Sequence, residues 1–239
     1  MIEPVLLAAV RVQTFLDDRL LTAASGFFFE REGRLFVVTS RHVLVDKPSN
    51  HHPNRVELAL HTDAVDLTRF SNVSVPLFRD GKSTWRQARD SGGEIDVATI
   101  EIDRAWLPKG ANLRAFTPEH LQGPLEEIGI GTPVLVVGFP LGFYDTLHYL
   151  PVGRHAGVAS AFGVRFQGQG YFLTDARMHR GASGSPVVLN DPGGDPKLPW
   201  KLLGIHSARL DMRTRDREAD ESLGLNCAWY ADILKTLTA

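Results

Sequence analysis

The chain has 239 residues, enough for one large all-β domain or for two small subdomains that share a core. A formal net charge of −2 gives no sign of a nucleic-acid or membrane surface, and a single cysteine, Cys227, excludes an internal disulfide framework. The N-terminal apolar run, 5–10, is too short for a signal sequence or a membrane span, so we expect a cytoplasmic protein.

Short apolar runs that are rich in β-branched and aromatic residues predict β-strands along the whole chain. In the first half they lie at 25–32, 34–40, 54–60, 72–78 and 95–102. In the second half they lie at 133–139, 153–163, 170–176, 185–190, 201–208 and 223–230. Short helical turns are expected at 118–123 and 231–237. Such regular spacing favours an antiparallel barrel or sandwich, and the strand-poor stretch 104–133 resembles a linker between two halves.

The stretch GASGSP, at 181–186, places Ser183 between two small residues in a tight turn. A serine hydroxyl is a poor nucleophile at neutral pH, and it needs an imidazole to take its proton and a carboxylate to orient that imidazole. His42 follows one strand-like run and Asp96 opens another, so the chain carries His, Asp and Ser in that order. The G-x-S-x-G elbow of α/β-hydrolases does not fit, because Ser185 stands where that elbow needs glycine.

Six motifs, in the same order along the chain, resemble those of chymotrypsin-fold serine peptidases. They are SGFFF (25–29), VVTSRHV (37–43), IDVATIEI (95–102), VLVVGFPLG (134–142), FLTDARMHRGASGSPVV (172–188) and LLGIHSA (202–208). The resemblance covers most of the chain. It is closest to the disulfide-free bacterial trypsin-like branch, which includes HtrA-type peptidases and glutamyl endopeptidases.

The resemblance implies an all-β fold of two packed, six-stranded antiparallel barrels with a short C-terminal helix. The first barrel, 1–110, would carry the catalytic His and Asp, and the second barrel, 111–239, would carry the nucleophile and the specificity pocket. Closing each barrel hides the strand edges that so many short strands would otherwise expose. The active site is then expected in the cleft between the barrels.

The same resemblance implies a role for each motif residue. His42 would be the general base and acid, Asp96 would orient it, and Ser183 would attack the carbonyl carbon of a peptide bond. The backbone amides of Gly181 and Ser183 would form the oxyanion hole. An endopeptidase of this kind hydrolyses protein or peptide substrates through an acyl-enzyme, and we expect it to need no cofactor or metal.

The nucleophile loop departs from that of secreted digestive relatives at Ala182. Those relatives have an acidic residue there, which pairs with the new N-terminus after zymogen cleavage. Alanine cannot form that ion pair. Either this protein folds directly into an active form, or something else controls the loop.

Specificity residues are expected on the strand that lines the primary pocket. His206 would point into the pocket and donate a hydrogen bond to a Glu or Gln side chain before the cut. Ser207 matches a serine that binds the triad aspartate, and Ala208 continues the same strand. Arg177 and Arg209 are the candidates for added positive charge near the pocket.

Two alternatives to a constitutive peptidase stay open at this point. The chain could be a protease-fold binding module that recruits a partner through its cleft. It could also be a latent peptidase that an activating partner switches on, or one that acts on a dedicated target protein. The sequence does not name such a partner.

Overall fold

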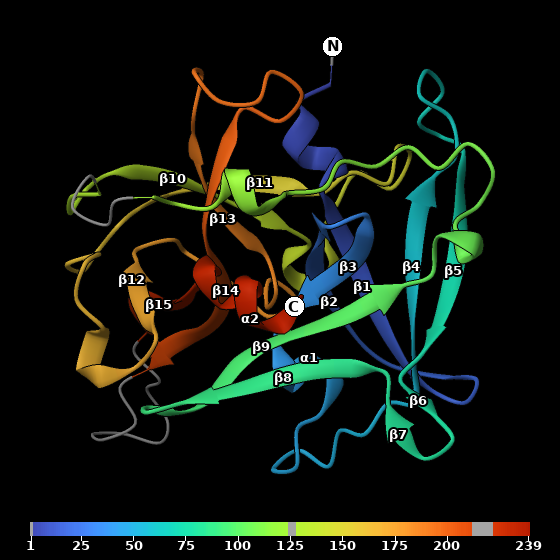
Figure 1. Ribbon diagram of the computed structural model, residues 1–239, viewed down its shortest axis with the longest axis horizontal. Helices are drawn as coiled ribbons and strands as arrows, with labels where there is room; N and C mark the ends of the chain where they lie inside the picture. Colours follow the sequence, from blue (N-terminus) through green and yellow to red (C-terminus); the bar gives the residue numbers. More distant parts are fainter. Residues whose placement is uncertain (1, 124–127, 212–221) are drawn as a thin grey trace.

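A computed structural model describes residues 2–123, 128–211 and 222–239 of the chain. β-Strands dominate, and they form two large antiparallel sheets that lie side by side (Figure 1). The first sheet has the strand order β5-β4-β1-β2-β3-β9-β8. Its strands are β1 (Ala9–Leu16), β2 (Arg19–Arg31), β3 (Arg34–Thr39), β4 (Arg55–His61), β5 (Phe70–Pro76), β8 (Trp85–Asp90) and β9 (Gly93–Ile102). A small separate hairpin consists of β6 (Phe78–Arg79) and β7 (Lys82–Ser83).

The second sheet has the strand order β11-β10-β13-β14-β15-β12. Its strands are β10 (Pro133–Gly138), β11 (Val152–Gly157), β12 (Tyr171–Thr174), β13 (Pro186–Asn190), β14 (Trp200–Asp211) and β15 (Ser222–Tyr230). This agrees with the all-β double-barrel class expected from the sequence. The expected count of six strands holds for the second sheet, whereas the first has seven strands among the described residues. The subdomain boundary at residue 110 stays a prediction.

Helices are few and short in the described residues, and none is long enough to cross a lipid bilayer. The α-helical turns are α1 (Arg41–Leu44) and α2 (Leu234–Leu237). The 3-10 turns are η1 (Pro4–Leu7), η2 (Arg104–Trp106), η3 (Pro118–His120), η5 (Pro140–Gly142), η6 (Phe166–Gly168) and η7 (Ala231–Ile233). The helical turns expected at 118–123 and 231–237 therefore form as η3 and as η7 followed by α2.

Three clusters of buried apolar side chains hold the molecule together, one inside each barrel and one between the barrels. Strand β2 shows how one sequence serves two of them, because neighbouring side chains of a strand point to opposite faces. Phe28 packs inside the first barrel, whereas Phe27 and Phe29 pack in the interface cluster. Burial of three such large side chains fixes the register of β2, the strand that contains the SGFFF motif.

The linker expected at 104–133 does cross from one sheet to the other. Phe116 forms an isolated bridge with Phe29 of β2, and Leu121 forms one with Leu202 of β14. At the other end of the chain, Leu234 and Leu237 of α2 join the interface cluster. The two sheets are thereby fixed to each other from both sides, which a site shared between them requires.

Candidate active site

The candidate catalytic residues come from three segments that the sheets bring together. Strand β3 pairs with β9, with Thr39 opposite Ala98, so the helical turn α1 that follows β3 lies beside the start of β9. This places His42, on α1, next to Asp96, on β9. Ser183 lies in the loop between β12 and β13 of the other barrel.

The carboxylate of Asp96 holds His42 through two contacts, one to its imidazole and one to its backbone amide. Nδ1 of His42 lies 2.6 Å from Oδ2 of Asp96, and the backbone amide of His42 donates to Oδ1 over 2.8 Å. The hydroxyl of Ser207 donates to Oδ2 of Asp96 over 2.5 Å. The carboxylate therefore fixes the tautomer with the proton on Nδ1, and Nε2 of His42 is free to accept a proton.

This arrangement moves the pKa of both side chains. Burial lowers the pKa of His42, but the hydrogen bond and the negative charge of Asp96 outweigh burial and raise it above the ordinary value of 6.5. Burial raises the pKa of Asp96, but the hydrogen bonds from His42 and Ser207 outweigh it and lower that pKa. Asp96 is therefore a carboxylate at neutral pH, and it stabilises a positive charge on His42.

Ser183 lies next to this pair, but its hydroxyl has another partner. Oγ of Ser183 donates to the carbonyl oxygen of Ser207 over 3.0 Å. Within the described residues, no hydrogen bond joins Ser183 to His42. The hydroxyl of Ser183 must leave the carbonyl of Ser207 before its proton can pass to Nε2 of His42.

The nucleophile loop presents two backbone amides that have no acceptor among the described residues, those of Gly181 and Ser183. The neighbouring carbonyl groups are all occupied. The carbonyl of Arg180 accepts from the amide of Leu141 over 2.6 Å, and the carbonyl of Ala182 accepts from the amide of Ser185 over 3.0 Å. Because these carbonyls already accept hydrogen bonds, the two free amides can bind an anionic oxygen.

Ser25, at the start of the SGFFF motif, ties this loop to the first barrel. Its hydroxyl donates to the carbonyl of Gly181 over 2.8 Å and accepts from the amide of Phe139 over 2.9 Å. Its own amide donates to the carbonyl of Ser183 over 3.0 Å. The side chain of Ser25 is completely buried, so these bonds are shielded from water.

Glycine is required at two positions of the loop. Gly181 and Gly184 each have a φ of +88°, which is costly for residues with a side chain. A Cβ atom on Gly181 would lie 2.7 Å from the carbonyl oxygen of Phe139. A Cβ atom on Gly184 would lie 2.1 Å from the carbonyl oxygen of Ser25. The glycines let the loop pack directly against the backbone of its neighbours.

Comparison with known protein families and structures agrees with this geometry. Residues 24–194 match the model of the trypsin-like peptidase domain, which is more than half of the chain. The chain belongs to the trypsin-like peptidase family. The match ends at residue 194, before β14, so the role of β14 as the specificity strand stays a prediction.

The relatives of this peptidase domain are HtrA-type proteins. The chain is 24% identical to serine protease HTRA1A of Danio rerio over 81% of its own length and 31% of that protein. It is 23% identical to human serine protease HTRA3 over 87% of its length and 39% of that protein. The chain thus spans about a third of the length of the curated relatives it matches.

Solved structures of HtrA-type proteases share the fold. The structure titled HtrA-type protease AlgW with tripeptide aligns over 98% of this chain and 59% of its own, with a TM-score of 0.60 and 17% identity. A serine endoprotease from Yersinia pestis aligns over 98% of this chain and 62% of its own, with a TM-score of 0.57 and 16% identity. At these identities the similarity concerns the fold.

The specificity residues expected on β14 of the peptidase domain differ in burial. His206 is buried, and its Nδ1 atom has no hydrogen-bond partner. Burial, together with the positive charge of the nearby His42, lowers the pKa of His206 to about 4. Ser207 is buried against Asp96, whereas Ala208 is exposed. Arg209 lies in β14, but its side chain is outside the described residues.

Among the described residues, no hydrogen bond or ion pair joins the side chain of Arg177 to a catalytic residue. Its side chain is exposed, and its backbone carbonyl accepts a hydrogen bond from the guanidinium of Arg154. The next residue, Met178, is buried in the core of the second barrel. Positive charge at the base of the pocket therefore has no support from the placement of Arg177.

Sequence reasoning did not identify the residues that brace the oxyanion amides. Ser25 lies 156 positions before Gly181, and Leu141 lies 40 positions before it. In the sequence, Gly181 indicates only that the loop needs glycine. The one available signal was the polar residue that begins the SGFFF motif, because this serine is the only polar side chain in the buried stretch 24–29 of β2.

Proposed function

We propose that this protein is a serine endopeptidase in which His42, Asp96 and Ser183 form the catalytic triad. The observation that carries the proposal is the 2.6 Å contact between His42 and Asp96, beside a serine whose loop presents two free amides. Such a set can transfer a proton, attack a carbonyl carbon and stabilise the charge that then forms.

The reaction follows from the same contacts. The hydroxyl of Ser183 turns from the Ser207 carbonyl toward His42, and Nε2 of His42 takes its proton as Oγ attacks the substrate carbonyl. The amides of Gly181 and Ser183 donate to the resulting oxyanion, while Asp96 stabilises the imidazolium. His42 then protonates the leaving amine, and a water molecule hydrolyses the acyl-enzyme by the same steps.

A fluorophosphonate probe tests this proposal because it reacts with activated serine hydroxyls. We expect a single adduct on Ser183 in the wild type, identified by mass spectrometry, and no adduct in Ser183→Ala. A folded wild type that stays unlabelled would instead favour a binding module. The far-ultraviolet circular dichroism spectrum shows whether each protein is folded.

A latent peptidase is the second candidate, and one observation favours it. The hydroxyl of Ser183 donates to the carbonyl of Ser207 and not to His42, so it must turn before its proton can pass to the base. A substrate or a protein partner that fills the cleft could drive this rotation. Fluorophosphonate labelling that starts slowly and accelerates at least tenfold with added peptide would support latency. Equal labelling with and without peptide would exclude it.

For specificity, we propose cleavage after Gln or Glu, read by His206. The buried Nδ1 atom of His206 has no partner, and a buried polar atom is costly until something pairs with it. Because burial keeps the imidazole neutral at pH 7, it suits the uncharged Gln amide better than a carboxylate. Fluorogenic peptides varied at the residue before the cut test this, and preference for Arg, Lys or large apolar residues would overturn it.

A further inference from the structure

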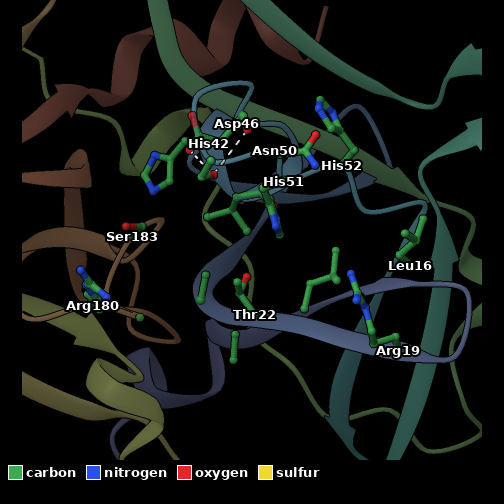
Figure 2. A pocket seen from close by; sticks show the side chains of 16 residues that line it. Leu16, Arg19, Thr22, His42, Asp46, Asn50, His51, His52, Arg180 and Ser183 are labelled. Atoms are coloured by element: carbon green, nitrogen blue, oxygen red, sulfur yellow. Dashed lines mark hydrogen bonds between the residues drawn. The ribbon is translucent and has the colours of Figure 1, made fainter.

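A long groove leads away from Ser183 on the side opposite the specificity strand. Its volume is about 730 Å³, and Ser183, Gly181 and His42 line one end of it. The other end is formed by the β1–β2 hairpin, and one wall by the segment from Asp46 to His52 (Figure 2). Its lining contains no residue of β14 or β15.

The position of this groove determines which part of a substrate enters it. In the proposed function, the residue before the cut contacts β14, which touches Ser183 through the carbonyl of Ser207. A groove that starts at Ser183 and avoids β14 must therefore take the residues after the cut. Its volume falls within the range of about 300–1,000 Å³ that is usual for ligand-binding clefts.

Strand β2 offers an open edge beside the groove. The amide of Ser25 donates to the carbonyl of Ser183, so the backbone of Ser25 faces the nucleophile loop and not β1. Backbone directions alternate along a strand, so the amide and carbonyl of Ala23 face the same way. Strand β3 pairs with β2 only from Phe27 onward, which leaves Ala23 open for an extended peptide to pair with.

A peptide that follows this edge away from Ser183 passes over Arg19. The guanidinium of Arg19 is exposed in the groove and has no hydrogen-bond or ion-pair partner among the described residues. Figure 2 shows Arg19 and His51 on opposite sides of the hollow. Nε2 of His51 bonds to the carbonyl of Val43 over 2.9 Å, so the position of its ring is fixed.

The charges that line the groove favour an acidic occupant. A second unpaired guanidinium, that of Arg180, lines the end next to Gly181. The lining contains one carboxylate, that of Asp46, and its Oδ2 already accepts a hydrogen bond from Ser49 in its own loop. An unpaired arginine in a concave site attracts carboxylates, and its planar donors can bind both oxygens.

We propose that this groove is a binding subsite for an acidic side chain among the first four residues after the cut, with Arg19 as its main ligand. The inference rests on the proposed function for the direction of the substrate. It adds a second selection, independent of His206, on the other side of the cleaved bond.

The test uses quenched fluorescent peptides with the same residues before the cut. Each peptide has Glu, Gln or Lys at one of the first four positions after it. For the wild type we expect kcat/KM to be about fivefold higher with Glu than with Lys at one of these positions, as for an exposed ion pair. The ratio should approach one in about 1 M salt, where the Debye length is about 3 Å.

The variant Arg19→Gln should reduce the Glu-to-Lys ratio to below about twofold. Because each variant is compared with itself, a change in folded fraction cancels from the ratio. Arg114→Gln makes the same change in net charge at an exposed site outside the groove and should keep the wild-type ratio. A wild-type ratio near one at all four positions, or a ratio that Arg19→Gln leaves unchanged, would overturn the subsite.

Binding to Ser183→Ala separates failure of the subsite from failure of the proposed function. Fluorescence anisotropy with the same peptides, labelled with a dye, measures the subsite without catalysis. If the wild type cleaves nothing, tighter binding of the Glu peptides that depends on Arg19 would still support an anionic subsite. Equal binding of the Glu and Lys peptides would overturn it.

Discussion

Two histidines lie close to the nucleophile loop, and their surroundings give them opposite properties. His42 is half-buried and faces the carboxylate of Asp96 at 2.6 Å, which raises its pKa. His206 is buried, its Nδ1 has no partner, and its pKa falls to about 4. Burial alone keeps a histidine neutral, whereas a paired carboxylate turns it into a base that can hold a proton.

In the proposed function, this difference separates two tasks within one cleft. A histidine that must accept a proton and become charged needs a counter-charge, which β9 supplies through Asp96. A histidine that reads an uncharged group must stay neutral, and burial in β14 ensures this. Variants that remove the carboxylate beside His42 should have the largest effect on this contrast.

Replacing the carboxylate should leave His42, like His206, without a negative charge that stabilises its protonated form. In Asp96→Asn, the amide cannot stabilise the imidazolium or fix the tautomer, so we expect kcat to fall about 10⁴-fold. The rate of peptide hydrolysis at saturating substrate concentration measures kcat. Ser207→Ala removes only one bond to the same carboxylate and serves as the control, with a much smaller loss. A loss below tenfold in Asp96→Asn would contradict the role of the pair.

Removing the neutral histidine should change selectivity more than overall rate. In His206→Leu, the Gln side chain of a substrate loses its hydrogen-bond partner, which costs about 1–3 kcal/mol for a buried polar group. We expect the preference for Gln over Leu before the cut to fall at least tenfold. The ratio of kcat/KM for the two peptides gives the answer, and an unchanged ratio would remove His206 from the specificity pocket.

Ser25 tests whether the oxyanion amides depend on the first barrel. Ser25→Ala leaves the buried carbonyl of Gly181 and the amide of Phe139 without a side-chain partner, and we expect kcat to fall about tenfold with little change in KM. The matched control is Ser160→Ala. Ser160 is also buried and accepts from Leu173, but it lies away from the nucleophile loop. Equal kcat in both variants would mean that Ser25 contributes only to stability.

The raised pKa of His42 should make stability and activity run in opposite directions with pH. Its stabilising contribution is complete below 6.5, the unfolded value, and is lost as pH rises through the higher folded value. Activity, which needs neutral His42, rises over the same interval. The difference in melting temperature between wild type and His42→Gln should therefore be larger at pH 5.5 than at pH 8.5. Each kcal/mol of unfolding free energy that His42 contributes corresponds to about 2–4 °C in melting temperature. A constant difference would contradict the shifted pKa.

The sequence was sufficient to predict the strands in which the local apolar pattern and the burial agree. The run 95–102 forms β9 at 93–102, because its apolar side chains are buried and Glu101 between them is exposed. Strands β1 and β8 were not predicted. The run 5–10, which overlaps the start of β1, was considered only as a signal sequence or a membrane span, and β8 carries charged residues on an outward face that hides its pattern.

The candidate site was predictable where it depends on motifs and not where it depends on side-chain direction. The chain order of His42, Asp96 and Ser183 indicated which residues would meet. The rotamer of Ser183, the brace formed by Ser25 and the exposure of Arg177 depend on contacts between distant segments. No single-sequence pattern encodes such contacts.

Cleavage of a complex peptide mixture tests the central claim most directly. The full chain and its Ser183→Ala variant are each incubated with peptides derived from a whole proteome, and mass spectrometry identifies the new termini. We predict new termini that follow Gln or Glu with the wild type and none with the variant. Equal cleavage by Ser183→Ala, or no cleavage by a folded wild type that fluorophosphonate labels, would contradict the assignment of a Ser183-dependent endopeptidase.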